Sequence, residues 1–291
     1  MSAANVSTEW RKDSGLFYGH FVYGAIFVIG SFLWVLKYYF IKGVLRQNDG
    51  SEKRRLSMKG IFRAIPWEGC IFLSGGCGGI ITNFCNQYFI LNMVGNDGKF
   101  VLDSLRGWQH TTEYVSLALY GLFIVLADTK FSSLVYYIKP IGSVTFAFLA
   151  TTFAFHSTMK DPVDSQIHNI LVLCGYGIAI SFAFETAYPT QKIFFMMRVF
   201  FTLLQGTWLM QSAFIIDPRN FQPWDGYDKL NIMFVSTSFF FHFVSDFWVV
   251  IFIFCCLMPN ICRNEKREIE YSFLEDKSEL GLIKVETDLG V

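Results

Sequence analysis

Charged side chains are scarce in this chain. Only 16% of its 291 residues are Asp, Glu, Lys or Arg, whereas 53% are hydrophobic and 18% are aromatic. So few charges cannot cover such an apolar core against water, although lipid covers it without penalty. The composition therefore predicts a multi-pass integral membrane protein, with the lipid bilayer as its main partner and no nucleic acid.

The chain also lacks the features of two familiar classes of membrane and secreted protein. The first apolar run is too long and too aromatic for a cleavable signal peptide, so we expect it to remain in the protein. No pair of cysteines lies on the outer side to form a disulfide, and neither an Asp-Arg-Tyr nor an Asn-Pro-x-x-Tyr motif is present. These absences argue against a G-protein-coupled receptor.

Seven apolar runs are long enough to cross a bilayer, which takes about 20 helical residues. These runs are long, and apolar and polar residues do not alternate along them, which favours helices over barrel strands. The predicted fold class is therefore all-α, a bundle of seven transmembrane helices placed near residues 17–37, 65–90, 108–127, 140–158, 165–187, 199–216 and 232–257.

Basic residues predict the orientation of this bundle. With the N-terminus outside, the inner segments carry fourteen Lys and Arg residues and the outer segments carry seven. The positive-inside rule then favours an outer or luminal N-terminus and a cytoplasmic C-terminus. We accordingly expect an outer segment at 1–16, a seven-span domain at 17–258 and a disordered cytoplasmic tail at 259–291, in the plasma membrane or the endosomal, Golgi or lysosomal system.

All five histidines fall toward the outer side of the predicted bundle. Four lie within about one helical turn of the outer boundary, and His242 lies about ten residues deeper. Polar side chains within a membrane need a partner or a function. The other four histidines, and the polar residues that complete a predicted cavity at similar depth, are His20, His110, His156, His168, Gln87, Gln109, Glu113, Gln205, Gln211 and Asp246.

Two spacings among these residues indicate a metal site. Asp164 and His168, and likewise His242 and Asp246, are four residues apart, so each carboxylate can reach the face of its histidine. Imidazole with carboxylate suits a transition metal, with zinc as the expected ion. The predicted ligands are His20, His110, His156, His168, His242, Asp164 and Asp246.

Other interpretations of the histidines remain open. Imidazoles near helix ends also hydrogen-bond to neighbouring helices and stabilise packing without a ligand. A haem site or a proton relay would use the same residue type.

A second polar set is predicted on the cytoplasmic side. It consists of Glu68, Glu185, Arg63, Lys139 and Arg198. Ion pairs that fix helix ends are one interpretation, and an ion pathway is the other. A water connection between the two sets would make the chain a proton-coupled transporter.

Several motifs recur near the ends of the predicted spans. They are Gly19-His20, Trp108-Gln109-His110, Phe155-His156, Asp164 with Ile167-His168, Leu204 to Trp208 with Gln211, and Trp224-Asp225 leading through Asn231 and Phe234 to His242. Together they resemble the transmembrane protein 45 family of multi-pass membrane proteins without an established reaction. The resemblance implies a membrane bundle and leaves the activity undefined.

These observations leave three functional classes. The first is a non-catalytic membrane protein acting in trafficking or partner binding. For that class, Tyr271-Ser272-Phe273-Leu274 resembles a sorting signal that would bind an adaptor. The second is a zinc-dependent membrane hydrolase or metal-handling protein, and the third is the proton-coupled transporter.

Overall fold

The computed structural model describes the backbone of residues 14–44, 65–85, 92–158, 160–218, 222 and 224–279. Side chains are described for residues 17–38, 65–85, 92–158, 160–218, 222 and 224–256. Within these ranges the chain is helical, with one isolated β-bridge between Val94 and Phe100. The helices are α1 (Ser14–Val44), α3 (Trp67–Cys85), α4 (Leu102–Thr129), η1 (Ser132–Tyr137), α5 (Ile138–Ser157), α6 (Pro162–Ala187), α7 (Lys192–Ile216) and α8 (Lys229–Glu279). The predicted all-helical class is confirmed.

Six of the described helical segments are long and apolar enough to cross a membrane. They are 17–38, 102–129, 132–157, 162–187, 192–216 and 229–256. Helix α3 is the one predicted span outside this set, because its 19 residues include five glycines and the polar Glu68 and Asn83. The chain is thus a multi-pass membrane protein.

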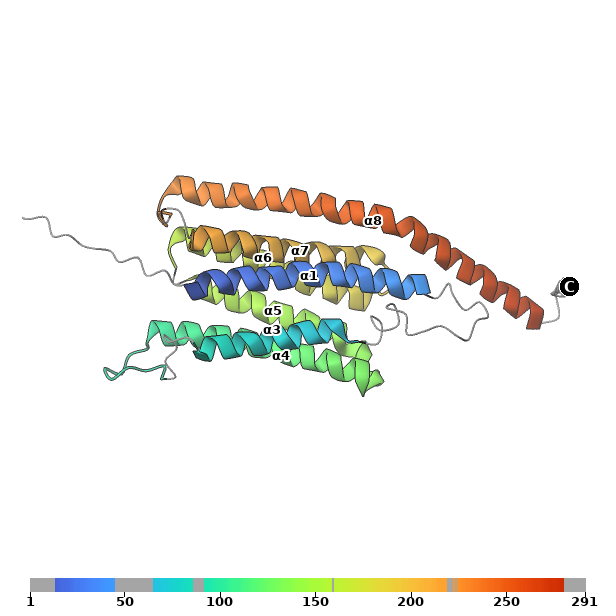
Figure 1. The fold of residues 1–291 in the computed structure, drawn as a ribbon, viewed down its shortest axis with the longest axis horizontal. Coiled ribbons are helices and arrows are strands. Elements are labelled where there is room, and N and C mark those ends of the chain that lie inside the picture. The colour runs from blue at the N-terminus through green and yellow to red at the C-terminus, as the bar shows by residue number, and fades with distance from the viewer. Residues whose placement is uncertain are drawn as a thin grey trace, which may run out of the picture. The chain divides into compact units, whose positions relative to one another are not determined.

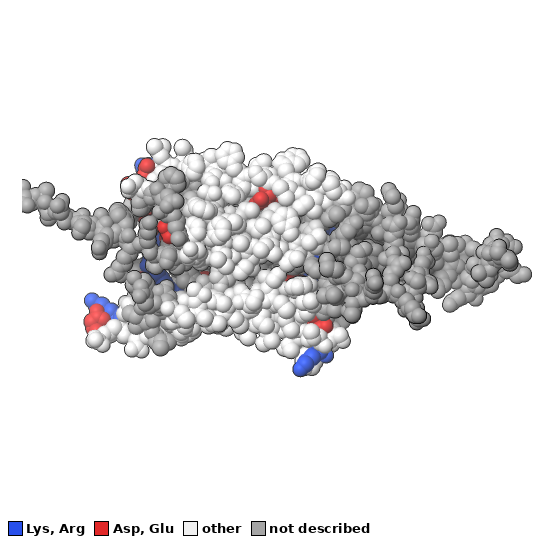
Figure 2. Space-filling model, viewed as in Figure 1, with Lys and Arg blue, Asp and Glu red and all other residues white. Residues whose placement is uncertain are grey.

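The chain forms two compact units. The first comprises described residues of 14–34 and 66–248, and the second those of 35–65 and 249–279. In the first unit the helices run side by side along a common direction (Figure 1), with α3 against α4, α5 against α6 and α6 against α7. Figure 2 shows that the visible surface of this unit is mostly uncharged along its middle, with charged groups gathered toward its ends.

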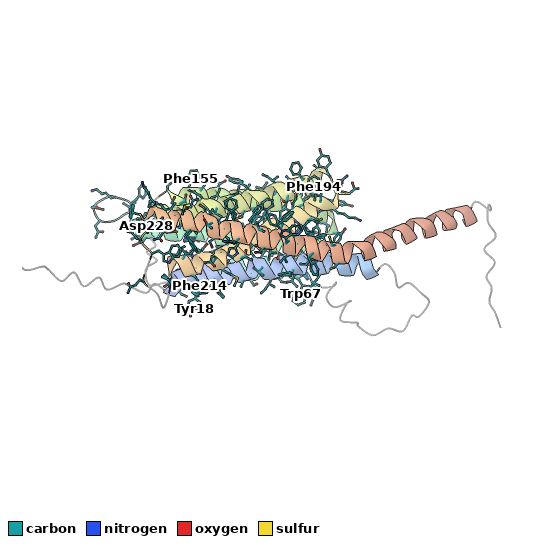
Figure 3. The ribbon with its side chains drawn as sticks, turned by 90° about the horizontal axis from the view of Figure 1, so that it is seen from above. Tyr18, Trp67, Phe155, Phe194, Phe214 and Asp228 are labelled. Atoms are coloured by element: carbon teal, nitrogen blue, oxygen red, sulfur yellow. The ribbon has the colours of Figure 1, made fainter. Side chains whose placement is uncertain are left out.

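Alternate helices of the first unit run in opposite directions. Tyr18 near the start of α1, Phe155 near the end of α5 and Phe214 near the end of α7 lie toward one end (Figure 3). Trp67 and Phe194, near the starts of α3 and α7, lie toward the other end. This arrangement places the beginnings and ends of the helices in two polar layers separated by apolar core.

Large aromatic side chains fill that core. Phe146 and Phe182 stack with their ring centroids 5.8 Å apart, and Phe72 lies 5.3 Å from Tyr120. Phe146, Phe182 and Tyr120 are at most 2% exposed. Such rings bury large areas and add about 0.5–1.5 kcal/mol per favourable pair beyond the burial itself.

Several helix boundaries differ from the predicted ones for identifiable reasons. Helix α7 begins at Lys192 instead of 199, because its first turns accommodate Arg198 through an ion pair with Glu185. Helix α6 begins at Pro162 instead of 165, since Asp161 caps it by accepting a hydrogen bond from the Asp164 amide, 2.9 Å away.

Helix α8 continues to Glu279, beyond residue 258, where a disordered tail was expected to begin. Residues 259–279 contain five Glu, two Lys and two Arg, which are strong helix formers. The proposed sorting segment Tyr271–Leu274 falls within this helical range, and its side chains lie outside those described.

Candidate functional site

The rings of four histidines, one from each of four helices, lie next to one another. The ring centroids of His110 on α4 and His156 on α5 are 4.7 Å apart, and those of His156 and His168 on α6 are 5.3 Å apart. His20 on α1 lies 5.8 Å from His168. We call His110, His156, His168 and His20, in this order, the imidazole row.

Three rings of the row are oriented by acceptor oxygens. The Nδ1 atom of His110 lies 3.3 Å from Glu113 Oε2, and that of His156 lies 3.1 Å from Gln109 Oε1. The Nδ1 atom of His168 lies 2.9 Å from the Asp164 backbone oxygen and 2.9 Å from its Oδ1. Because each partner is an acceptor, each neutral ring carries its proton on Nδ1 and leaves Nε2 as a lone-pair acceptor.

A carboxylate stands at each end of the three oriented rings. Glu113 is 4% exposed, and within the described part of the chain its Oε1 has no hydrogen-bond partner. Asp164 forms an ion pair of 2.7 Å with Lys160, whose side chain is 9% exposed. The order Glu113, His110, His156, His168, Asp164 is therefore a continuous line of titratable groups.

Helical spacing explains how these groups meet. Glu113 follows His110 by three residues on α4, and Asp164 precedes His168 by four on α6, so each pair shares one helix face. Sequence reasoning missed Lys160, although its position four residues before Asp164 was a readable signal.

Two tyrosines form the floor of the row. Tyr23 and Tyr114 stack at 5.1 Å, and Tyr23 donates a hydrogen bond of 2.9 Å to the Gly75 carbonyl oxygen. They follow His20 and His110 by three and four residues, so they lie one turn deeper. A Cβ on Gly79 would lie 2.0 Å from the Tyr23 hydroxyl oxygen, so only glycine fits beneath this pair.

The row does not amount to a ready metal centre. No group of three or more His, Cys, Asp and Glu side chains in the described ranges is placed to hold a metal ion. The Nδ1 atoms of His110, His156 and His168 each face a separate oxygen, so only their Nε2 atoms have free lone pairs. The zinc ligand set expected from the sequence is thus not preformed in this part of the chain.

His242 and Asp246 lie apart from the row. The ring of His242 packs edge-on against Trp208 at 5.9 Å, and Asp246 accepts a hydrogen bond of 2.6 Å from Thr207 Oγ1. The expected pairing of these two residues through their four-residue spacing is replaced by contacts to α7. The Thr207 hydroxyl was not singled out by the sequence.

The structure places the predicted cavity residues in different environments. Gln109 orients His156, as described, and Gln211 is half-buried on α7. Gln205 is 2% exposed, and its Oε1 has no partner among the described residues. Gln87 lies outside the described residues.

The inner polar set includes one buried ion-pair network. Arg198 Nε pairs with Glu185 Oε1, and Lys139 Nζ lies 3.2 Å from Glu185 Oε2. The Arg198 guanidinium also lies over the ring of Trp34, 4.1 Å from its centroid. Glu68 lies in the first turn of α3, and Arg63 is outside the described residues.

Residues 136–256 match DUF716, a family of unknown function. Rat transmembrane epididymal protein 1 is 29% identical over 140 residues, which cover 47% of this chain and 46% of that protein. Mouse transmembrane epididymal protein 1A is 27% identical over 139 residues, 47% of this chain and 46% of that protein. The human protein named transmembrane epididymal protein 1 is 25% identical over 181 residues, 57% of this chain and 64% of that protein.

These comparisons correct the resemblance drawn from motifs. The relatives are named transmembrane epididymal protein 1, and the resemblance to the transmembrane protein 45 family is wrong. The motifs at Gly19-His20 and Trp108-Gln109-His110 lie outside the matched segment, so they were weak grounds for that choice. The chain spans about half the length of the first two relatives, and it is a multi-pass membrane protein similar over residues 136–256 to a family of unknown function.

Proposed function

We propose that this membrane protein binds protons from the outer or luminal side and relays them along the imidazole row. The observation that carries this proposal is the continuous line of Glu113, His110, His156, His168 and Asp164. Chains of Asp, Glu and His within membrane-spanning helices are the usual composition of proton relays.

The orientation of the rings supports a proton as the bound cation. Each of the three rings has its Nδ1 facing an acceptor, so the Nε2 atoms are acceptors without an assigned donor. A proton can pass between rings in contact, whereas a metal requires several ligands around one point. No group of three or more His, Cys, Asp and Glu side chains in the described ranges is placed around such a point, which favours the proton over zinc.

The line of titratable groups is partly exposed at His110 and Asp164 and buried between them. The side chain of His110 is 31% exposed and that of Asp164 is 19% exposed, whereas His156 and His168 are 5% and 1% exposed. The other titratable groups that face the row are Glu113, Asp164, Lys160 and the Tyr23–Tyr114 pair. Protons can reach the ends from water and must pass through the buried rings between them.

We further propose seven spans with an outer N-terminus, α3 completing the six segments described above. The excess of basic residues on the inner side supports this orientation. An odd number of spans places the two termini on opposite sides of the membrane. Epitope tags at each end should therefore differ in antibody accessibility in intact cells, and tags that are both accessible or both protected would contradict seven spans.

Histidine titration tests the relay directly. Rings about 5 Å apart repel each other's positive charge, so the first proton bound opposes the second and the titration broadens. Solid-state ¹⁵N NMR of histidine-labelled protein in bilayers should show broad, coupled titration of the row. In His156→Gln, His110 should lose its coupling to the rest of the row, whereas His168 keeps His20 as a neighbour 5.8 Å away.

His242→Gln provides the matched control, because this ring packs against Trp208 outside the row. It should remove one signal and leave the coupled titration intact. Coupling between His110 and His168 that survives His156→Gln would contradict the relay.

Metal analysis separates the relay from the zinc hypothesis. We expect purified protein to hold much less than one equivalent of zinc, and His156→Ala to leave that content unchanged. One equivalent of zinc that disappears in His156→Ala would replace the proton relay by a metal site. A proton-binding site that faces the lumen also suits an acidified endosomal compartment, and sorting through Tyr271–Leu274 stays a prediction.

A further inference from the structure

Helix α7 carries a stripe of buried polar side chains on one face. Arg198, Thr202 and Gln205 are spaced by four and three residues, so they lie in successive turns of the same face. Their exposed fractions are 7%, 2% and 2%. We call these three residues the α7 stripe.

Each member of the α7 stripe has an unpaired polar atom. Arg198 Nη1, Thr202 Oγ1 and Gln205 Oε1 have no hydrogen-bond partner among the described residues. The hydroxyl of Tyr120 on α4, which interacts electrostatically with Arg198, also has none and is 1% exposed. Buried polar atoms are nearly always paired, and within a membrane-spanning bundle neither bulk water nor lipid can pair them.

The spacing of the stripe matches that of bridging water molecules. Residues three or four apart on a helix have Cβ atoms about 5–6 Å apart. One water that makes two hydrogen bonds of about 2.8 Å spans about the same distance. Water molecules that bridge successive members of the stripe would satisfy these atoms and form a continuous file.

The outer end of the stripe lies below the imidazole row. Helix α6 ends at Ala187 and α7 begins at Lys192, so the two helices are level at this turn. From there His168 lies 19 residues outward and Gln205 lies 13, so at about 1.5 Å per residue they differ in depth by about 9 Å. The Trp208 indole, which donates a hydrogen bond of 3.2 Å to the Ile167 carbonyl oxygen, lies in this interval, and further bridging water would extend the file across it.

The inner end of the stripe reaches an acceptor with access to water. Arg198 pairs with Glu185, and Glu185 also contacts Lys139, whose side chain is 41% exposed. Seven residues separate Gln205 from Arg198, a rise of about 10 Å. The stripe thus covers about 10 Å of the roughly 25 Å that the 17 residues between His168 and Glu185 span along α6.

We infer that the α7 stripe is the inner half of a transmembrane proton pathway that connects the imidazole row to Glu185. This inference rests on the proposed function, because the row supplies the proton at the outer end. A proton passes from a protonated imidazole to the adjacent water, and each O–H bond that forms is matched by one that breaks at the next oxygen. Glu185 receives the proton as its carboxylate becomes a carboxylic acid, then releases it to water beside Lys139.

Charges around the stripe set the barrier to this transfer. Arg198 and Lys139 are positive and oppose an arriving proton, whereas Glu185 attracts it. Glu68 on α3 interacts electrostatically with Tyr120, and Asp246 on α8 with Cys174 on α6. A proton that neutralises Glu185 removes the partner of Arg198, so transfer couples to the position of that side chain.

Proton flux into liposomes tests the pathway. The full chain is reconstituted with a pH-sensitive dye inside, and a potassium gradient with valinomycin drives protons inward. The wild type should acidify the lumen faster than empty liposomes. Gln205→Leu and Thr202→Val remove the oxygens that hold the file and should each slow acidification about tenfold, which corresponds to a barrier higher by about 1.4 kcal/mol.

Matched controls carry the same changes away from the stripe. Gln191→Leu lies at the exposed N-cap of α7, where its side chain makes no capping hydrogen bond, and Thr237→Val lies on α8 with its hydroxyl bonded to the Met233 carbonyl. Both should retain the wild-type rate. Size-exclusion profiles and circular dichroism establish that every variant is folded before its flux is compared.

Three results would overturn the pathway. The first is wild-type protein that acidifies the lumen no faster than empty liposomes do. The second is a wild-type rate of acidification in both stripe variants. The third is a loss of rate in the control variants as large as that in the stripe variants. Coupled histidine titration without flux would leave the relay standing and remove the pathway alone. Flux that survives His156→Gln would instead show a pathway that does not use the row.

Discussion

Arg198→Ala is expected to lower the melting temperature of the detergent-solubilised protein by about 10 °C or more. The guanidinium is buried, pairs with Glu185 and lies against Trp34 and Phe182. Its removal leaves the Glu185 carboxylate buried, with the half-exposed Lys139 as its remaining cationic partner. Breaking a buried pair from one side costs about 3–5 kcal/mol, and each kcal/mol corresponds to about 2–4 °C in a chain of this size class.

Two variants distinguish the ion pair from simple loss of side-chain volume. Lys139→Ala removes the exposed partner, and such partners contribute about 0–1 kcal/mol, so the melting temperature should change little. The double variant Arg198→Met with Glu185→Met replaces both charges by apolar groups and should recover most of the loss. A double variant as unstable as Arg198→Ala would show that aromatic stacking on the guanidinium, and not the charge pairing, stabilises this end of the bundle.

The local sequence was sufficient to predict contacts within one helix. Asp164 and His168 meet because four residues separate them on one helix face, and His110 and Glu113 meet because three do. The same rule failed at His242 and Asp246, since Thr207 on α7 offers a hydroxyl to the carboxylate. Spacing determines which side chains share a face, but the neighbouring helix determines which partner each one takes.

Contacts between helices required the coordinates. The common depth of the histidines was readable from span boundaries, whereas their order in the row depends on how α1, α4, α5 and α6 pack. That order matters chemically, because a proton passes only between rings that are in contact. The α7 stripe was hidden for a similar reason. Thr202 is an ordinary residue in an apolar run, and only its burial without a partner makes it notable.

Gly76→Ala is expected to destabilise the protein, because the backbones of α3 and α4 approach closely at this glycine. A Cβ at Gly76 would lie 2.5 Å from both the Ala118 amide nitrogen and the Tyr114 carbonyl oxygen. These are backbone atoms of α4, which cannot rotate away as a flexible side chain would, so the two helices must separate. We expect this overpacking to lower the free energy of unfolding by about 1–3 kcal/mol. The melting temperature should fall by about 3–10 °C.

Gly78→Ala is the control for this change, because it lies two residues away on the same helix and a Cβ there meets nothing within 4 Å. Alanine also has the higher intrinsic helix propensity, by about 1 kcal/mol in a helix interior. The control should therefore match or exceed the wild-type melting temperature, while Gly76→Ala falls below it despite the same gain in propensity. Equal stability of the two variants would mean that α3 is not held against α4 at this distance. The floor that Tyr23 and Tyr114 form beside α3 would then be free to shift, and the imidazole row above it would lose its fixed geometry.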